Sequence, residues 1–401
     1  MPTLLGPDAS KLRITLNPHP VALPNPTDLQ FGKHVTDHTL QIPWSATHGW
    51  HTPRITPYQP LTLDPTASVF HYGFECFEGM KAYKDASGAL RLFRPEINIA
   101  RLNTSAARVS LPTFDEEQML ALLAKFVEIE GRWIPNIRGY SLYLRPVIIG
   151  TNPGLSVSPP TSALLYVVAS PVGSYFQSQS QTLSPSGTSA PAGIVLQATP
   201  SARYVRAWPG GSGAHKVGAN YAPCMVAEQE AKSQGAHQAL WLFGDEEEIT
   251  EAGTMNLFLV LKLEDGEREL VTPPLDGMIL PGVTRDCVLG LARERLPGWV
   301  VSERRITMGE LEGAAERGMV EEVFGTGTAA VVTSVGRIRW KGRVIRCGNE
   351  TSLAMQMRKW IEARQYGEDE HEWSVLVETL VQAPLGDKHQ GEAEVELEAR
   401  L

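Results

Sequence analysis

Cysteine is scarce in this sequence, and its thiols are widely separated. The four cysteines among 401 residues form no CxxC pair, which argues against a zinc ribbon or a dithiol redox motif. An even number is compatible with disulfides, but the wide spacing favours free thiols in a reducing compartment. The ten histidines include no HExxH or other metal-ligand spacing, so we expect no metal site.

Long apolar runs and an excess of positive charge are also absent. No run approaches the roughly 20 apolar residues of a membrane helix. The 45 acidic residues outnumber 36 basic ones, which disfavours binding to nucleic acid or to an anionic membrane surface. Residues 1–30 carry Asp8 and Asp28 beside Lys11 and Arg13, unlike the Arg-rich, acid-poor pattern of a mitochondrial presequence. We therefore expect a cytoplasmic protein, with a mitochondrial location less favoured.

Length and composition indicate two domains that mix helices and strands, of the α/β or α+β class. We expect an irregular lead-in at 1–30 and a small first domain at 31–177. A linker rich in Ser, Pro and Gly follows at 178–192, then a larger second domain at 193–376 and an acidic tail at 377–401.

Capping residues and apolar periodicity predict the main helices. Thr113 with Glu116, and Thr307 with Glu310, have the spacing of capping boxes, and Pro95 is suited to open a helix. Further helices are predicted at 283–296 and 351–364. Apolar runs predict strands at 163–169, 193–197, 239–243 and 256–263.

Glycines surround Lys216 in the segment from Gly210 to Tyr221. A P-loop is excluded, because His215 and Val217 stand where that motif requires Gly and Ser or Thr. A lysine that binds an aldehyde must be desolvated or lie near other cations, since a free amine has a pKa of about 10.4. The alternative is a surface lysine in a flexible loop.

Three further groups are candidates for chemistry. Glu251, which we place at a turn between two strands, can pair with a protonated ring nitrogen or be an exposed turn residue. The small residues and hydroxyls at 324–330 can bind a phosphate or form a tight turn. Tyr143 and Arg145 alternate along a predicted strand and therefore face one side, as a carboxylate clamp or as part of a structural ion pair.

In this order and spacing, the groups resemble the branched-chain amino acid aminotransferases of fold type IV, most of all the eukaryotic, fungal members. Matching segments run from 31–38 to 365–373, with others at 70–73, 76–83, 92–95, 141–150, 206–208, 270–275 and 279–285. The resemblance implies two domains with pyridoxal 5'-phosphate at their interface, and a homodimer. It also implies ping-pong transamination of L-leucine, L-isoleucine and L-valine with 2-oxoglutarate, giving branched 2-oxo acids and L-glutamate (the 2.6.1.42 type of transaminase).

The resemblance further implies a role for each matching residue. Lys216 would be catalytic, holding the cofactor aldehyde and moving the α-proton. Glu251 would contact the pyridine nitrogen, Tyr221 the ring hydroxyl and Arg101 the phosphate. Other phosphate donors would be Val283, Thr284 and Thr328. The residues of the substrate pocket would be Phe31, Tyr72, Tyr143, Arg145, Tyr175, Thr254 and Ala329.

Two positions depart from the family pattern. Ala330 and Thr333 stand where mammalian members carry a CxxC pair, so we expect no thiol switch. His215 stands where Tyr or Phe is usual, either as a tolerated ring swap or as a titratable group that changes the pH dependence. Three alternatives stay open: another fold-type-IV enzyme such as a D-amino acid aminotransferase, a paralogue specialised for another amino or oxo acid, and a non-catalytic homologue.

Overall fold

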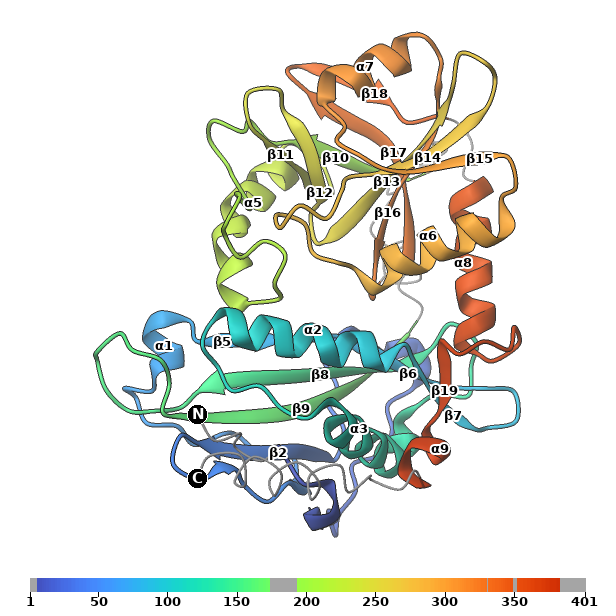
Figure 1. Ribbon diagram of the computed structural model, residues 1–401. Coiled ribbons are helices and arrows are strands. Elements are labelled where there is room, and N and C mark those ends of the chain that lie inside the picture. Colours follow the sequence, from blue (N-terminus) through green and yellow to red (C-terminus); the bar gives the residue numbers. More distant parts are fainter. Residues whose placement is uncertain (1–5, 174–192, 330, 349–351, 383–401) are drawn as a thin grey trace, which may run out of the picture.

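The chain forms two sheets, each with its own hydrophobic core. The structure, a computed structural model, describes residues 6–173, 193–329, 331–348 and 352–382. In Figure 1 the helix α2 (Pro95–Arg108) is drawn between the strands of the first sheet and the second body. The predicted linker at 178–192 lies outside the described residues. The predicted fold class, two domains of mixed α and β structure, is confirmed.

The first sheet has the strand order β1-β4-β2-β9-β8-β6-β7-β19, with β3 beside β2 and β5 beside β8. Its strands are β1 (Arg13–Ile14), β2 (His38–Ser45), β3 (Gly49–Trp50), β4 (Arg54–Pro57), β5 (Glu75–Phe77), β6 (Met80–Lys84), β7 (Leu90–Phe93), β8 (Ser141–Gly150), β9 (Ser162–Val172) and β19 (Ser374–Leu376). The helices of this body are α1 (Ser68–Tyr72), α2, α3 (Glu116–Glu130) and α9 (Val377–Gln382).

Strand alternation gives β8 one face that packs into the core and a second, more polar face that carries Tyr143 and Arg145. Tyr143 on β8 is paired with Lys81 on β6, and Val147 is paired with Phe77 on β5, so these side chains share one face with Arg145. The other face of β8 enters the core formed with α2 and α3 through Leu142, Leu144 and Ile148. The polar face is therefore free to build a site.

The second sheet has the order β12-β11-β10-β17-β16-β13-β14-β15, and a β12–β13 pairing closes the first six of these strands into a ring. Its strands are β10 (Ile194–Ala198), β11 (Gln238–Phe243), β12 (Glu248–Ala252), β13 (Met255–Lys262), β14 (Arg268–Thr272), β15 (Trp299–Glu303), β16 (Val320–Gly327), β17 (Val331–Trp340) and β18 (Arg343–Arg346). The helices of this body are α5 (Met225–Ser233), α6 (Val283–Arg295), α7 (Met308–Glu316) and α8 (Ser352–Gln365).

Most predicted helix starts are confirmed. Helix α2 begins at Pro95, and Thr307 caps α7 by accepting the Glu310 N–H at 3.1 Å. The predicted capping box at Thr113 is wrong, because Asp115 caps α3 and accepts the Gln118 N–H at 2.9 Å. Asp115 directly precedes the first helical residue, so its short carboxylate reaches the free backbone N–H groups of the first turn.

The end of the described chain returns to the first body. Strand β19 pairs antiparallel with β7, and α9 lies against α3. Figure 1 shows both elements in red beside the blue and green strands of that body. The structure therefore moves residues 374–382 out of the second domain and the tail, where the sequence had placed them. An apolar strand edge and an amphipathic helix bury more surface there than a solvated tail would.

Candidate functional site

Lys216 is the centre of a cluster of aromatic and charged side chains between the two bodies. Its Nζ lies 3.1 Å from the hydroxyl of Tyr221 and 4.8 Å from the ring centroid of Phe77. Its backbone N–H donates to the Ser105 hydroxyl of α2 at 2.8 Å, and its carbonyl accepts the Phe77 N–H at 3.0 Å. The backbone is thus fastened to the first body. The lysine is not a freely solvated loop residue.

The environment of Lys216 makes it easier to deprotonate than an ordinary lysine. Burial lowers the pKa of its ammonium to about 8, and the positive charge of Arg101 acts in the same direction. The negative charge of Glu78 opposes both effects. A substantial fraction of neutral amine near neutral pH is what a nucleophilic lysine requires.

Arg101 is fixed by a buried carboxylate, Glu78, for which no role was predicted. Its Nε and Nη2 donate to the two oxygens of Glu78 at 2.6 and 2.9 Å, and its Nη1 donates to the Pro281 carbonyl at 2.8 Å. Burial disfavours the charge on Glu78, but Arg101 outweighs it and holds the pKa of this carboxyl below its usual value. A guanidinium has five N–H groups, so both terminal nitrogens keep a donor for an anion.

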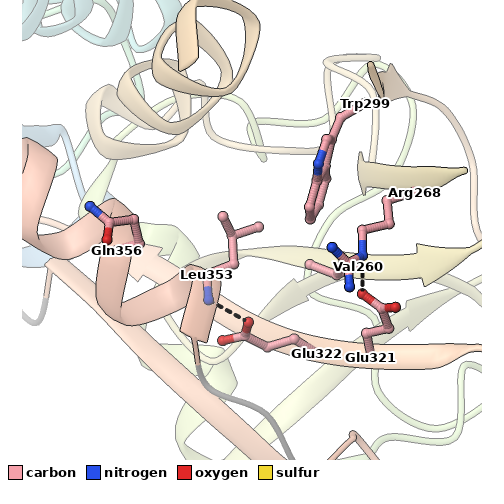
Figure 2. Close-up of a pocket in the computed structure, with 7 residues that line it drawn as sticks. All are labelled: Val260, Arg268, Trp299, Glu321, Glu322, Leu353 and Gln356. Atoms are coloured by element: carbon pink, nitrogen blue, oxygen red, sulfur yellow. Dashed lines mark hydrogen bonds and ion pairs between the residues drawn. The ribbon is translucent and has the colours of Figure 1, made fainter. Parts of the chain in front are cut away.

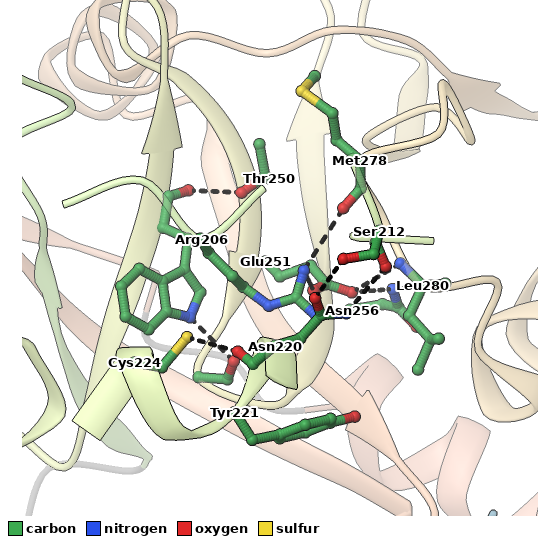
Figure 3. A network of polar contacts seen from close by, with 12 residues as sticks. Arg206, Ser212, Asn220, Tyr221, Cys224, Thr250, Glu251, Asn256, Met278 and Leu280 are labelled. Atoms are coloured by element: carbon green, nitrogen blue, oxygen red, sulfur yellow. Dashed lines mark hydrogen bonds and ion pairs between the residues drawn. The ribbon is translucent and has the colours of Figure 1, made fainter. Parts of the chain in front are cut away.

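Glu251 lies in a network that anchors one of its oxygens and leaves the other directed at a cation (Figure 3). Oε1 accepts from Asn256 Nδ2 and from the Leu280 N–H, each at 3.1 Å. Oε2 lies 2.7 Å from Arg206 Nη1, an ion pair without hydrogen-bond geometry. Burial raises the pKa of Glu251, and the charge of Arg206 is the chief influence that opposes this rise.

The position of Glu251 corrects one expectation. It lies within β12, paired with Asn256 on β13, and the turn between these strands consists of Gly253 and Thr254. A strand holds a carboxylate more rigidly than the turn that we expected, because both neighbouring strands fix its backbone. Oε2 of Glu251, which accepts no hydrogen bond from the described residues, therefore has a defined direction.

The first turn of α6 offers backbone donors. Its N-cap residue, Gly282, has no side chain to cap the helix. No cap side chain therefore accepts a hydrogen bond from the first N–H groups, at Val283 and Thr284, and these groups are available to an anion. Val283, Thr284 and Thr328 line one small cavity together with Lys81. A Cβ on Gly282 would lie 2.0 Å from Asn256 Oδ1, so only glycine allows this close approach.

Four of the predicted pocket residues have contacts beside this cluster. Arg145 Nη2 donates to the Tyr143 hydroxyl at 2.9 Å, and the ring centroids of Phe31 and Tyr143 are 4.7 Å apart. The Arg145 guanidinium carbon lies 4.7 Å from the Phe77 ring centroid. The carbonyl of Ala329 accepts a hydrogen bond from Lys81 Nζ at 2.9 Å.

The other predicted pocket residues are placed differently. The hydroxyl of Tyr72 donates to the Leu155 carbonyl, on a part of the surface formed by α1 and the loop after β8. Thr254 has an exposed side chain, but its carbonyl oxygen lies beside Gly327, 3.8 Å from where a Cβ on that glycine would be. Tyr175 lies outside the described residues.

Three residues of this cluster had no role assigned from sequence: Phe77, Glu78 and Arg206. Each lies within a matching segment, and each is conspicuous there as a charge or an aromatic ring among small or apolar neighbours. That signal could have identified them as candidates. Their partners could not be identified from it, because Glu78–Arg101 and Arg206–Glu251 join residues that are far apart in the sequence.

His215, the departure beside Lys216, has the properties of a neutral ring. Its Nδ1 is buried and has no hydrogen-bond partner among the described residues. Burial lowers the pKa of His215, and the positive charge of Arg108 acts in the same direction. Both effects favour the interpretation of a tolerated ring swap over that of a group that titrates near neutral pH.

A second hollow, of about 310 Å³, lies by the second sheet near the start of α8 (Figure 2). Its charged groups already have structural partners. The Glu322 carboxylate accepts the N–H groups of Leu353 and Ala354 at the start of α8, each at 3.0 Å, and Arg268 pairs with Glu321 at 2.7 Å. We assign this hollow to the packing of α8. Among the described residues, no group of three or more His, Cys, Asp or Glu side chains could hold a metal ion.

Comparison with known proteins gives a consistent result. Residues 75–338 match the family described as amino-transferase class IV. The cytosolic branched-chain-amino-acid aminotransferase of Saccharomyces cerevisiae is 48% identical over 388 residues, covering 94% of this chain and 100% of the relative. The mitochondrial branched-chain-amino-acid aminotransferase of Rattus norvegicus is 44% identical over 373 residues, covering 92% of each chain.

Solved structures agree with this result. The T.th. branched-chain amino acid aminotransferase, complexed with N-(5'-phosphopyridoxyl)-L-glutamate, superposes with a TM-score of 0.62 at 27% identity. The match covers 84% of this chain and 98% of that one. The cluster around Lys216 therefore lies within a fold that carries a phosphopyridoxyl group in another protein.

Proposed function

The chain belongs to the amino-transferase class IV family, and on that premise we propose that it transfers amino groups from L-leucine, L-isoleucine and L-valine to 2-oxoglutarate. The products are the branched 2-oxo acids and L-glutamate, and the cofactor is pyridoxal 5'-phosphate. One observation carries the proposal: a partly buried lysine amine with a lowered pKa lies between an aromatic ring and a phenol, close to anchored cations and carboxylates.

The residues of the site fit the three chemical parts of this cofactor. Glu251 Oε2 is a buried acceptor without a hydrogen-bond donor, which suits a protonated ring nitrogen. The uncapped start of α6 and the spare N–H groups of Arg101 suit a phosphate. The Lys216 amine suits an aldehyde. We assign Val283, Thr284 and Thr328 to the phosphate, and Tyr221 to the ring hydroxyl.

In the mechanism, the cofactor when bound supplies an aldehyde that condenses with amines and a ring that takes up electron density. Lys216 Nζ acts first as a nucleophile and then carries the α-proton of the substrate. With a pKa of about 8, about a tenth of this amine is neutral at pH 7. Burial raises the pKa of Tyr221 to about 12, so its hydroxyl stays protonated beside Nζ.

The substrate pocket combines apolar rings with one cation. Phe31, Tyr143 and Phe77 offer aromatic surface to a branched side chain, and Arg145 offers a guanidinium to the second carboxylate of glutamate. Because the three branched substrates differ by a methylene or a branch point, discrimination among them is on the order of 1–3 kcal/mol.

The test is a half-reaction of the purified, cofactor-loaded protein with a panel of amino acids, followed by visible absorbance. We expect the spectrum to change with L-leucine, L-isoleucine, L-valine and L-glutamate. A response to D-alanine in place of L-leucine would identify a D-amino acid aminotransferase. A protein that loads cofactor but responds to no amino acid would be the non-catalytic homologue, and a response to another substrate alone would be the specialised paralogue.

The proposal extends to the oligomeric state of the protein and to its cellular compartment. We propose a homodimer, supported by apolar side chains exposed on α1 and on the loop after β8, where Phe70 is 60% and Leu155 67% exposed. Within the described part of the chain, no helix has the length and apolar character to span a membrane. Relatives with cytosolic and with mitochondrial names are equally similar at 48% identity. The cytosol is our proposal, and imaging of a fluorescent fusion tests it.

A further inference from the structure

A pocket that serves both half-reactions must accept two opposite kinds of side chain, and this inference rests on the function proposed above. In one half-reaction the pocket holds an apolar branched chain, and in the other it holds a carboxylate. A guanidinium enclosed with an apolar group and no counter-charge is unfavourable. The pocket therefore needs a negative group that balances Arg145 without blocking it.

Arg145 is held mainly by aromatic contacts. Its Nη2 donates to the Tyr143 hydroxyl at 2.9 Å, its guanidinium carbon lies 4.7 Å from the Phe77 ring centroid, and its Nε is buried without a hydrogen-bond partner. None of the ion pairs within the described ranges involves Arg145. The guanidinium therefore keeps donors for a substrate carboxylate.

Glu75 is on the same face of the sheet as Arg145. It lies on β5 two residues before Phe77, and its backbone is paired with Ile149, which shares a face of β8 with Arg145. Its carboxylate lies against the chain just after Lys216, since a Cβ on Gly218 would lie 1.6 Å from Glu75 Oε2. Glycine at 218 thus makes the room in which this carboxylate sits.

The charges of Glu75 and Arg145 act on each other. Burial raises the pKa of Glu75, and the guanidinium of Arg145 is the largest influence that opposes the rise. The N–H of Gly218 also stabilises the ionised form. Tyr166 on β9 is affected by both charges in opposite directions, which places the three groups in one electrostatic cluster.

We propose that Glu75 is a specificity-determining residue. Its negative charge balances Arg145 while the pocket holds a branched apolar side chain, and this charge is neutralised when the second carboxylate of glutamate binds. The neutralisation requires no movement of the backbone. A second carboxylate near Arg145 repels the negative charge of Glu75, so Glu75 takes up a proton more readily in the glutamate complex than in the leucine complex.

The experiment compares the holoenzyme with its Glu75→Gln variant, which keeps the shape of the side chain and removes its charge. Two non-reacting ligands report on the pocket by calorimetry: 4-methylpentanoate for the apolar chain and glutarate for the second carboxylate. The values of kcat/KM for L-leucine and L-glutamate are measured in parallel. Glu228→Gln is the matched control, since Glu228 is also half-buried with a pKa raised by burial, but lies on α5.

We expect Glu75→Gln to raise the ratio of glutarate affinity to 4-methylpentanoate affinity about tenfold, the order expected for one unit charge near a protein surface. The kcat/KM ratio of glutamate to leucine should rise with it, and Glu228→Gln should change neither. Ratios within about twofold of the parent holoenzyme would overturn the inference.

Two further outcomes are decisive. If the parent enzyme turns over neither L-leucine nor L-glutamate, the proposed function itself is refuted. If the parent enzyme is active but both ratios are unchanged in Glu75→Gln, only the role of Glu75 is refuted. If Glu75→Gln does not fold, as shown by circular dichroism, Glu75→Asp replaces it. This variant draws the charge back by one methylene and should shift both ratios in the same direction by a smaller amount, and unchanged ratios would again refute the role.

Discussion

At the scale of single residues, the chemistry depends on how burial and charge set the protonation of a few groups. Lys216, Glu251 and Glu78 are all buried enough for desolvation to be the largest influence on their pKa values, yet their shifts differ. Glu78 stays ionised because Arg101 binds both of its oxygens, whereas the pKa of Glu251 is raised because its cation makes one contact. Geometry decides between the two outcomes.

Lys216→Ala should abolish the visible absorption that arises when the cofactor is bonded to the lysine. Turnover should fall at least about a thousandfold, since positioned proton transfer alone contributes on the order of 10²–10⁴. The measurement is an absorption spectrum together with a leucine assay. Lys232→Ala, on the exposed face of α5, is the control and should match the parent protein. A Lys216 variant that kept both absorption and turnover would disprove the assignment.

Arg206→Gln should move the acid limb of the activity profile to higher pH. Arg206 opposes the burial that raises the pKa of Glu251, so its loss raises this pKa further. Glu251 is then protonated up to a higher pH, and activity that needs its charge is lost as the pH falls through that higher value. The measurement is kcat/KM against pH. Arg206→Lys keeps the positive charge and should reverse part of the shift, and an unmoved acid limb in Arg206→Gln would contradict the role of Arg206.

At the scale of elements, helix starts and strand pairings position these groups. The closed ring of strands places Glu251 on β12 directly beside Asn256 on β13. The start of α6 lies against this pair, because Asn256 donates to the Leu280 carbonyl at 2.9 Å. One asparagine therefore links the carboxylate assigned to the ring nitrogen with the helix assigned to the phosphate.

Gly282→Ala tests this link. The added Cβ would lie 2.0 Å from Asn256 Oδ1, so Asn256 must shift and Glu251 loses one of its donors. We expect cofactor affinity to fall about tenfold or more, since such changes cost on the order of 1–3 kcal/mol. Equilibrium dialysis of the cofactor measures this. Gly313→Ala within α7, where only the end of the Arg317 side chain is near, should leave cofactor affinity unchanged, and equal losses in both variants would refute the link.

At the scale of the whole molecule, the site depends on contacts between the two bodies, which also share an apolar cluster that joins Tyr83 and Phe93 to residues of α6 and α8. Residues of the first body hold Lys216 and Arg101 in place, whereas Glu251 and the start of α6 belong to the second body. The Arg101–Pro281 hydrogen bond crosses between the two bodies. Relative movement of the bodies would therefore separate the groups that the reaction needs together.

Leu155→Asp tests the proposed dimer. Leu155 is exposed and its carbonyl accepts the Tyr72 hydroxyl of α1, and a charge placed in a contact between two copies would be desolvated without a partner. We expect the mass measured by light scattering to fall from two chains toward one at micromolar concentration. Val344→Asp, at another exposed apolar residue, on β18, is the control. A parent protein of one-chain mass would refute the dimer directly.

Much of the local structure could be predicted from sequence because its causes are local. Proline at a helix start, a threonine cap before α7 and a shared side of β8 for Tyr143 and Arg145 each depend on a few residues, and these predictions are confirmed. The capping box at Thr113 was wrong because a nearer cap, Asp115, competes within the same turn. The resemblance to a known family named Lys216 and Glu251, but it assigned no role to Phe77, Glu78 or Arg206.

The sequence by itself determined which groups are available: one lysine among glycines, an alternating Tyr143–Arg145 pair, helices opened by proline or threonine, and membership in a family. Only the tertiary structure decided which charges act on each other. The pairs Glu78 and Arg101, Arg206 and Glu251, and Glu75 and Arg145 are each separated by 23 or more residues, and a pKa depends on distance in space and on burial. Neither quantity exists until the two sheets and α2 are packed together.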